Sequence, residues 1–321
     1  MAKVAVTRKI PGNGIKMLQD AGYEVVVSPH DRALERQELL NFIQGSSGVL
    51  TMLTDKVDQE FINSAGPNLK IVANYAVGVD NLDLPVLSSH NIIATNTPDV
   101  LTEAVAEHTF ALIMAITRRI VEADKLARSE TSRFGPEVML GTQLQGKILG
   151  VLGLGRIGSR VAEIGKSLGM NVIYYDIKKN ADFEAKVGAK FSAMPEELLK
   201  EADVVSVHVP LLDATRHLIN SERLKLMKKT AYLINTSRGP VVAEAQLTEA
   251  LRNKTIAGAA LDVGEEEPKW AEGLGDLPNV ILTPHIASAT YEARSAMGEV
   301  AAKNIIAVLS GQEPLTPVKV K

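Results

Sequence analysis

Short and mostly continuous apolar runs alternate with amphipathic stretches along the whole chain. Continuous runs of this length are typical of strands buried on both faces, as in parallel sheets covered by helices. The alternation therefore predicts an α/β protein. The first set of expected strands is Val4–Thr7, Glu24–Val27, Val49–Leu53, Ile71–Tyr75 and Ile92–Ala94. The second set is Ile148–Leu154, Val172–Tyr175, Val204–Val209, Ala231–Ile234, Ile256–Ala260 and Val280–Leu282.

One long helix-compatible stretch separates the two sets of strands. It opens at Thr102 and Glu103, after Thr97 and Pro98 have ended the preceding strand, and it continues to Ser129. Helices in globular domains usually have three or four turns, so this stretch is longer than a crossover between neighbouring strands needs. We therefore predict one long helix that connects two α/β domains.

Composition narrows the classes of partner and chemistry. The 321 residues include 35 basic and 38 acidic side chains, and only 4% are aromatic, so we expect no nucleic-acid partner. The absence of cysteine excludes disulfides, thiolate zinc sites and cysteine nucleophiles. The longest apolar run, Phe110–Ile116, is far shorter than the ~18 residues that span a bilayer. We expect a cytoplasmic protein with no membrane partner and no metal site.

A glycine-rich segment, GLGRIG at 153–158, follows the expected strand Ile148–Leu154 and precedes a helix expected at Ser159–Leu168. This is the G-x-G-x-x-G pattern in the strand–turn–helix setting that a dinucleotide site requires. The first glycine makes the tight turn, the second lets a pyrophosphate approach the backbone, and the third lets the helix pack close to the strand. The helix N-terminus then offers free N–H groups to the phosphates.

Asp176 indicates which dinucleotide is bound. It ends the strand Val172–Tyr175 and lies about 20 residues after Gly155, where a carboxylate accepts hydrogen bonds from the ribose hydroxyls. A carboxylate there repels a 2′-phosphate, so the sequence favours NAD over NADP. Lys178 and Lys179 follow closely and soften this preference, which leaves NADPH use open.

Three polar clusters follow strands of the second set. They are Asn235–Gly239, Asp262–Pro268 and Pro284–Ser288. Ligands of open α/β sheets bind at the carboxyl ends of the strands, so we expect all three clusters near the nicotinamide end of the cofactor. Glu265 and Glu266 are interpreted as a solvated acidic loop, and His108 and His217 receive no role in the chemistry.

The chain resembles the D-2-hydroxyacid dehydrogenase family. The motifs that carry the resemblance run in the family's order: YAVGVDN at 75–81, TPDVLTEAVAEH at 97–108, GLGRIG at 153–158, HVPL at 208–211, INTSRG at 234–239, LDVGEEEP at 261–268 and PHIASAT at 284–290. The opening VAVTRKIPGNGIKML, the segment TDKVD at 54–58 and FGPEVMLGTQLQGK at 134–147 are similar to the glyoxylate/hydroxypyruvate reductase branch.

The resemblance implies two doubly wound domains. One is a Rossmann-type NAD-binding domain at residues 99–288. The other is a flavodoxin-like substrate domain, discontinuous in sequence, at residues 1–98 and 289–321. The family is usually homodimeric, and the long helix with the loop from about residue 118 to residue 147 is expected to be the dimerisation arm.

The resemblance also implies three catalytic residues for the reduction of a small 2-keto acid. Arg238 would bind the substrate carboxylate and the reacting oxygen through its planar fork of N–H donors. His285 would donate the proton to the alkoxide as hydride arrives. Glu267 would accept a hydrogen bond from the other ring nitrogen, fix the tautomer and favour the protonated imidazole.

Further contacts are carried over from the matching motifs. Asp262 is expected to support the site near the nicotinamide amide, and His208 to line the cofactor site without chemistry. The cofactor contacts are Gly153, Gly155, Arg156, Ile157, Gly158, Asp176, His208, Pro210, Thr236, Ser237, Arg238, Asp262, His285 and Ala287. The substrate contacts are Leu53, Val77, Gly78, Arg238 and Ser288.

Alternatives stay open within and beyond this enzyme class. A D-3-phosphoglycerate dehydrogenase and a broad D-2-ketoacid reductase share the same catalytic set, and a dinucleotide-sensing scaffold without turnover could keep it too. The chain departs from the family pattern at Gly264, where a bulky aromatic is usual, at Ala287, where glycine is common, and at Phe134, where tryptophan is frequent. These departures affect the shape of the pocket rather than the reaction.

Overall fold

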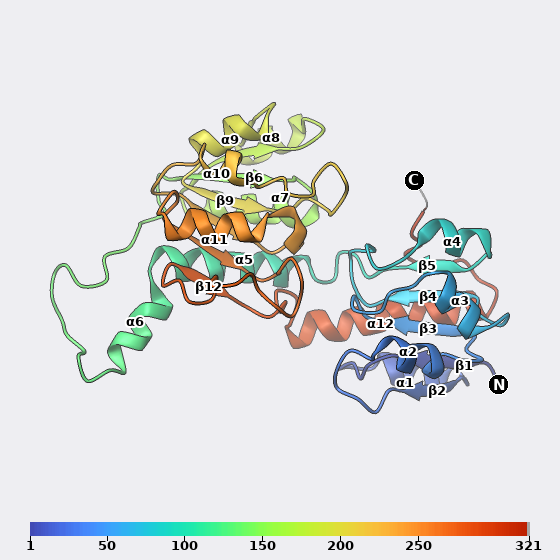
Figure 1. Ribbon diagram of the computed structural model, residues 1–321. Coiled ribbons are helices and arrows are strands. Elements are labelled where there is room, and N and C mark those ends of the chain that lie inside the picture. Colours follow the sequence, from blue (N-terminus) through green and yellow to red (C-terminus); the bar gives the residue numbers. More distant parts are fainter. Residues whose placement is uncertain (320–321) are drawn as a thin grey trace. The chain divides into compact units, whose positions relative to one another are not determined.

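The computed structural model describes residues 1–319, which divide into two compact units (Figure 1). Unit 1 consists of Met1–Leu101 and of the residues from Ala289 onward, and unit 2 consists of Thr102–Ser288. The chain leaves unit 1 after its fifth strand and returns to it for its last helix. The change of unit after Leu101 falls a few residues later than the expected boundary at residue 98.

Unit 1 contains a parallel five-stranded sheet in the order β2-β1-β3-β4-β5, which is the flavodoxin-like doubly wound order. Every residue of the two inner strands β3 and β4 is buried, as their continuous apolar sequences require. The strands are β1 (Lys3–Val6), β2 (Glu24–Val27), β3 (Gly48–Thr51), β4 (Ile71–Asn74) and β5 (Ile93–Thr95).

Helices cover both faces of this sheet. Helices α2, α3 and α4 share a core with the strands, while α1 and α12 pack together and α12 lies against β3 and β4. The helices are α1 (Gly14–Asp20), α2 (Arg36–Phe42), α3 (Gln59–Ala65), α4 (Leu84–Ser89) and α12 (Tyr291–Leu309). The carboxyl ends of the parallel strands are therefore left for loops.

Unit 2 contains a parallel seven-stranded sheet in the order β12-β11-β10-β9-β6-β7-β8. Read from β8, this is the Rossmann order, and it reverses between β6 and β9, where dinucleotides bind. The strands are β6 (Ile148–Leu152), β7 (Asn171–Tyr175), β8 (Lys190–Phe191), β9 (Val204–Val207), β10 (Tyr232–Asn235), β11 (Gly258–Leu261) and β12 (Val280–Leu282). The α/β class and both doubly wound domains are confirmed, while β8, with two residues, was too short to leave an apolar pattern.

Two separate cores lie on the two faces of this sheet. One core includes residues of α5, α7 and α8, and the other includes residues of α9, α10 and α11. The helices of unit 2 are α5 (Thr102–Thr117), α6 (Ile120–Ala127), α7 (Arg156–Ser167), α8 (Ala181–Val187), α9 (Pro195–Glu201), α10 (Ser221–Leu224), the short 3₁₀ helix η1 (Gly239–Val241) and α11 (Glu244–Arg252).

The single long helix predicted from Thr102 to Ser129 is wrong, because the helix is broken after Thr117. Arg119 adopts a left-handed conformation with φ of 54°. The carbonyl oxygen of Thr117 accepts a hydrogen bond from the backbone N–H of Thr142 at 2.8 Å, so a loop takes the acceptor that a continuing helix would use. A contact distant in sequence therefore ends α5, and α6 starts in a new direction.

Helix α6 has no buried residue. Together with the segment that follows it, α6 extends away from the sheet and the helices of unit 2 (Figure 1). Within residues 1–319, no helix combines the length and the apolar character needed to cross a membrane.

Candidate active site

The glycine loop connects β6 to α7 at the point where the strand order reverses. Gly155 is the N-cap, and α7 begins at Arg156 rather than at the expected Ser159. A Cβ atom on Gly158 would lie 2.0 Å from the carbonyl oxygen of Gly153, so close packing of helix against strand requires glycine there. A Cβ on Gly155 would meet nothing within 4 Å. The second glycine thus faces open space, as a phosphate-binding backbone must.

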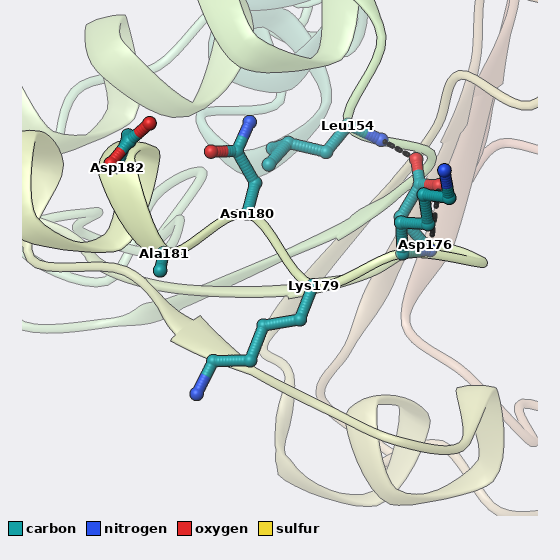
Figure 2. Close-up of a pocket in the computed structure, with 7 residues that line it drawn as sticks. Leu154, Asp176, Lys179, Asn180, Ala181 and Asp182 are labelled. Carbon is teal, nitrogen blue, oxygen red and sulfur yellow. Dashed lines mark hydrogen bonds between the residues drawn. The ribbon is translucent and has the colours of Figure 1, made fainter.

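Asp176 follows β7 and lies beside the glycine loop. Its carboxylate accepts a hydrogen bond from the backbone N–H of Leu154 at 2.7 Å, as Figure 2 shows. A cavity of about 390 Å³ opens here. Its lining residues are Leu154, Asp176, Lys178, Lys179, Asn180, Ala181 and Asp182. The carboxylate therefore belongs to a concave site of polar character next to the glycine loop.

The two lysines of this cavity differ in their partners. Lys179 forms an ion pair with Glu184 at 3.3 Å, and its side chain is directed away from Asp176 (Figure 2). The side chain of Lys178 is exposed and has no ion-pair partner within residues 1–319. Lys178 is thus the cation of this cavity that remains available to a ligand.

The loop after β9 passes over the glycine loop. A Cβ on Gly153, which has φ of +95°, would lie 2.8 Å from the carbonyl carbon of His208. The His208 ring shares a hydrogen bond of 2.7 Å with Ser206, and burial lowers the pKa of His208 to about 3. His208 is therefore a neutral ring beside the dinucleotide loop, while Pro210, two residues on, is exposed.

A carboxylate–imidazole pair lies in the loops that follow β11 and β12, at the carboxyl edge of the same sheet. Nδ1 of His285 is 2.8 Å from Oε2 of Glu267, and both side chains are partly exposed, at 31% and 40%. The other oxygen of Glu267 accepts a hydrogen bond from the backbone N–H of Gly264 at 3.2 Å. With Nδ1 engaged, Nε2 is the nitrogen of His285 that can exchange a proton with a ligand.

Asp262 supports the loop that carries His285. Its buried carboxylate accepts hydrogen bonds from the backbone N–H groups of Ile286 and Ala287, each at 2.8 Å, and from the Thr283 hydroxyl at 2.6 Å. Burial raises the pKa of Asp262, but the hydrogen bonds from His108, Thr283 and these backbone groups outweigh burial and hold the pKa below its usual range. The contact expected between Asp262 and the nicotinamide stays a prediction.

The loop that follows β10 carries Arg238. Asn235, buried at the end of the strand, donates a hydrogen bond to the carbonyl oxygen of Arg238 at 2.9 Å and accepts one from the Ser237 hydroxyl at 2.9 Å. Thr236 shares a hydrogen bond of 2.9 Å with Thr109 of α5. Asn235 belongs to the strand-end cluster expected from the sequence, but Thr109 was missed, because its pairing with Thr236 joins segments 127 residues apart and leaves no local signal.

Gly239 brings the Arg238 loop against the loop that carries Glu267. A Cβ on Gly239 would lie 1.7 Å from the carbonyl oxygen of Gly264, so the two backbones touch. Gly264 itself is covered by Trp270, whose ring would be 3.2 Å from an added Cβ. Both glycines are therefore fixed by packing, and at Gly264 the tryptophan fills the space that an aromatic at 264 would need.

The expectation that residues 265–266 form a solvated acidic loop is wrong for Glu265. Glu266 is exposed, but Glu265 pairs with Nε2 of His217 at 2.5 Å and accepts a hydrogen bond from the backbone N–H of Glu244 at 3.1 Å. His108 also has partners that were not foreseen, because its ring lies 3.2 Å from the Thr283 hydroxyl and 3.4 Å from Asp262. Pairing of side chains from separate elements is invisible to a local sequence pattern.

The expected substrate contacts of unit 1 follow its inner strands. Leu53 comes just after β3, and Val77 and Gly78 come just after β4. Asn96 donates a hydrogen bond to the Val77 carbonyl at 2.8 Å, and Asn74 donates one to the Gly78 carbonyl at 2.9 Å. The turn is therefore held through its carbonyl groups by two amide side chains.

In unit 2, Ser288 is the last residue, next to the buried Ala287. No group of three or more metal-ligating side chains occurs in the part of the chain that the structure describes.

A doubly wound sheet with a glycine loop at its switch point and an acid–base pair at the same edge defines a dinucleotide-dependent dehydrogenase. Comparison with known proteins gives the family. Residues 110–287 match the family described as D-isomer specific 2-hydroxyacid dehydrogenase, NAD binding domain. The chain belongs to this family of NAD(P)-dependent oxidoreductases.

Relatives match over nearly the whole length. The chain is 47% identical to a glyoxylate reductase of Pyrococcus furiosus, over 98% of this chain and 95% of that protein. It is 48% identical to a glyoxylate reductase of Thermofilum pendens, over 97% of this chain and 93% of that protein. An NADPH-dependent glyoxylate/hydroxypyruvate reductase structure from Sinorhizobium meliloti matches with a TM-score of 0.85 and 31% identity, over 99% of this chain and 96% of that one.

Proposed function

We propose that this protein reduces glyoxylate or hydroxypyruvate with NADH, giving glycolate or D-glycerate. The observation that carries the proposal is the pair of His285 and Glu267, 2.8 Å apart, at the carboxyl edge of the dinucleotide-binding sheet. The names of the relatives that match over nearly the whole chain support the choice of substrate. The overall change is the addition of hydride and one proton to the keto group.

The dinucleotide, when bound, supplies the hydride that goes to the keto carbon. The residues of the chain supply the rest. Nε2 of His285 gives a proton to the keto oxygen as charge develops there, and Glu267 fixes the orientation and tautomer of the ring by accepting the Nδ1 hydrogen bond. Arg238 binds the substrate carboxylate and the reacting oxygen, because a guanidinium matches two oxygens in one plane.

The residues that would hold the dinucleotide fit it chemically. The open face of Gly155 and the N-terminus of α7 suit a pyrophosphate, with Arg156, Ile157 and Gly158 in the first turn. The Asp176 carboxylate suits ribose hydroxyls and opposes a 2′-phosphate. The other proposed contacts are Gly153, His208, Pro210, Thr236, Ser237, Asp262 and Ala287.

We assign the substrate contacts of unit 1 to Leu53 and to the backbone N–H groups of Val77 and Gly78. Backbone N–H groups suit a carboxylate because they add no competing charge and are fixed by the fold. In unit 2, Ser288 joins Arg238 as a proposed contact.

We further propose a cytoplasmic homodimer formed through the arm, defined as residues 118–147. The arm exposes several apolar side chains to solvent, which is expected of an interface. They are Ile120, Val121, Phe134 and Leu140. Light scattering at micromolar concentration should give twice the chain mass, and a value near 34.5 kDa would reject the dimer.

The proposed reaction is tested by the loss of NADH absorbance. The panel is glyoxylate, hydroxypyruvate, pyruvate and phosphohydroxypyruvate, each repeated with NADPH. Fast turnover of either of the first two, with a higher kcat/KM for NADH than for NADPH, is the expected result. Activity on the phosphorylated acid alone would make the protein a D-3-phosphoglycerate dehydrogenase. Equal turnover of every acid would make it a broad 2-ketoacid reductase, and binding of NADH without turnover would make it a sensing scaffold.

A further inference from the structure

The loop that carries Glu267 is tied to helix α11 by two carboxylates. Glu244, buried at the start of α11, accepts a hydrogen bond from the backbone N–H of Glu265 at 2.7 Å and another from the backbone N–H of Ala271. The Glu265 carboxylate in turn accepts a hydrogen bond from the backbone N–H of Glu244 at 3.1 Å. Both ends of the 265–271 segment are therefore fixed to the same helix terminus.

A third side chain completes this arrangement. Nε2 of His217 lies 2.5 Å from Oε1 of Glu265, with Glu265 mostly buried and His217 partly exposed. The backbone N–H of His217 donates to the carbonyl oxygen of Pro240, two residues after Arg238. His217 thus contacts both the Glu267 loop and the Arg238 loop. We call Glu244, Glu265 and His217 the clasp.

We propose that Glu265 is a positioning residue whose clasp holds Glu267 at hydrogen-bonding distance from Nδ1 of His285. This inference rests on the proposed function, because Glu267 and His285 matter as an acid–base pair only if the protein turns over a keto acid. The physical reason is that Glu265 is close to Glu267 along the chain, so fixing the backbone at Glu265 restricts where the Glu267 side chain can lie. Glu265 is two residues from Glu267, and the backbone N–H of Gly264 between the clasp and β11 also binds the Glu267 carboxylate.

The neighbouring acid provides a matched control. Glu266 is exposed, and its side chain has no hydrogen-bond or ion-pair partner within the described part of the chain. Truncation of Glu266 removes the same number of atoms and the same charge from the same loop. A difference in kcat between the Glu265 and Glu266 variants therefore measures the effect of the clasp rather than the loss of one negative charge.

A double-mutant cycle tests the proposal. We expect Glu265→Ala to lower kcat with glyoxylate about tenfold while the KM for NADH stays within about twofold, and Glu266→Ala to change neither. In a Glu267→Gln background, Glu265→Ala should lower kcat less than about twofold, because a residue that acts through Glu267 has nothing left to position. An equal loss in both backgrounds would overturn the proposal.

A spectroscopic readout separates this proposal from the proposed function. The Nδ1–H proton of His285, hydrogen-bonded to a carboxylate, should give a downfield ¹H resonance that Glu267→Gln removes. Glu265→Ala should broaden or remove this resonance, and Glu266→Ala should preserve it. If wild-type protein shows the resonance but reduces no keto acid, the proposed function fails while the clasp stands. A resonance that is intact in Glu265→Ala would overturn the clasp.

A conservative variant, Glu265→Gln, distinguishes a loss of positioning from misfolding. Glu265→Gln keeps an oxygen acceptor for the backbone N–H of Glu244 and the length of the side chain. We expect it to recover most of the kcat that Glu265→Ala loses, with a melting temperature equal to that of Glu266→Ala. If Glu265→Gln is as impaired as Glu265→Ala at an unchanged melting temperature, positioning through this backbone contact is refuted.

Discussion

The two halves of the site in unit 2 are built by opposite means. The proposed phosphate-binding half is one continuous segment, Gly153–Gly158, in which the absence of side chains lets helix α7 pack close at Gly158 and leaves the backbone open at Gly155. The proposed acid–base half combines Arg238, Glu267 and His285 from three separate loops. In that half, buried carboxylates hold the loops: Asp262 binds the backbone around His285, and Glu244 binds the backbone of the Glu267 loop.

This difference decides which kind of change damages each half. An added methyl group is the harmful change at Gly153 and Gly158 of the glycine loop, because it meets backbone that cannot move aside. Loss of a carboxylate is the harmful change in the acid–base half, because it leaves buried N–H donors without a partner, at about 1–3 kcal/mol for each group. Substitutions of these two kinds therefore distinguish the two halves.

The largest effect is expected where chemistry itself is removed. His285→Ala should lower kcat by at least ~10²-fold, the lower end for general acid catalysis, while NADH still binds to the glycine loop. Steady-state kinetics with glyoxylate and NADH fluorescence titration measure the two quantities. His30→Ala, an exposed histidine of unit 1, is the control and should behave as wild type. Unchanged turnover in His285→Ala would refute the proposed mechanism.

The same difference explains which features could be predicted from the sequence and which could not. The α/β class, the glycine loop and the strand-end clusters could be predicted because each depends on neighbouring residues. The break after Thr117, the partners of Glu265 and the contact of Gly239 with Gly264 could not. Each of these joins segments far apart in the chain, and its residues satisfy no local period or spacing.

The next effect separates two glycines of one loop. Gly158→Ala places a methyl group 2.0 Å from the Gly153 carbonyl oxygen, so we expect a loss of unfolding free energy on the order of 1–3 kcal/mol or more. Gly155→Ala meets nothing in the protein and should leave stability within about 0.5 kcal/mol while weakening NADH binding. Urea unfolding and NADH titration check both. The reverse pattern would mean that Gly155 is not the residue the phosphates approach.

The smallest effect concerns the carboxylate that supports His285. The pKa of Asp262 is lower in the folded protein than in the unfolded chain, near 3.9. Its contribution to stability is therefore present above about pH 4 and is lost as the pH falls through the lower folded pKa. Asp262→Asn removes this contribution and turns an amide N–H₂ toward a backbone donor. We expect a loss of about 1–2 kcal/mol at pH 7.

Urea unfolding between pH 7 and pH 3 measures this contribution. The gap in unfolding free energy between wild type and Asp262→Asn should be widest at pH 7 and should narrow toward pH 3, because only the wild type loses a stabilising carboxylate. Asp276→Asn removes an exposed carboxylate from the same unit and should show no such gap. A gap that stays constant with pH would mean that the Asp262 charge does not hold the His285 loop, and the contrast between the two halves of the site would then rest on the Glu244 contacts alone.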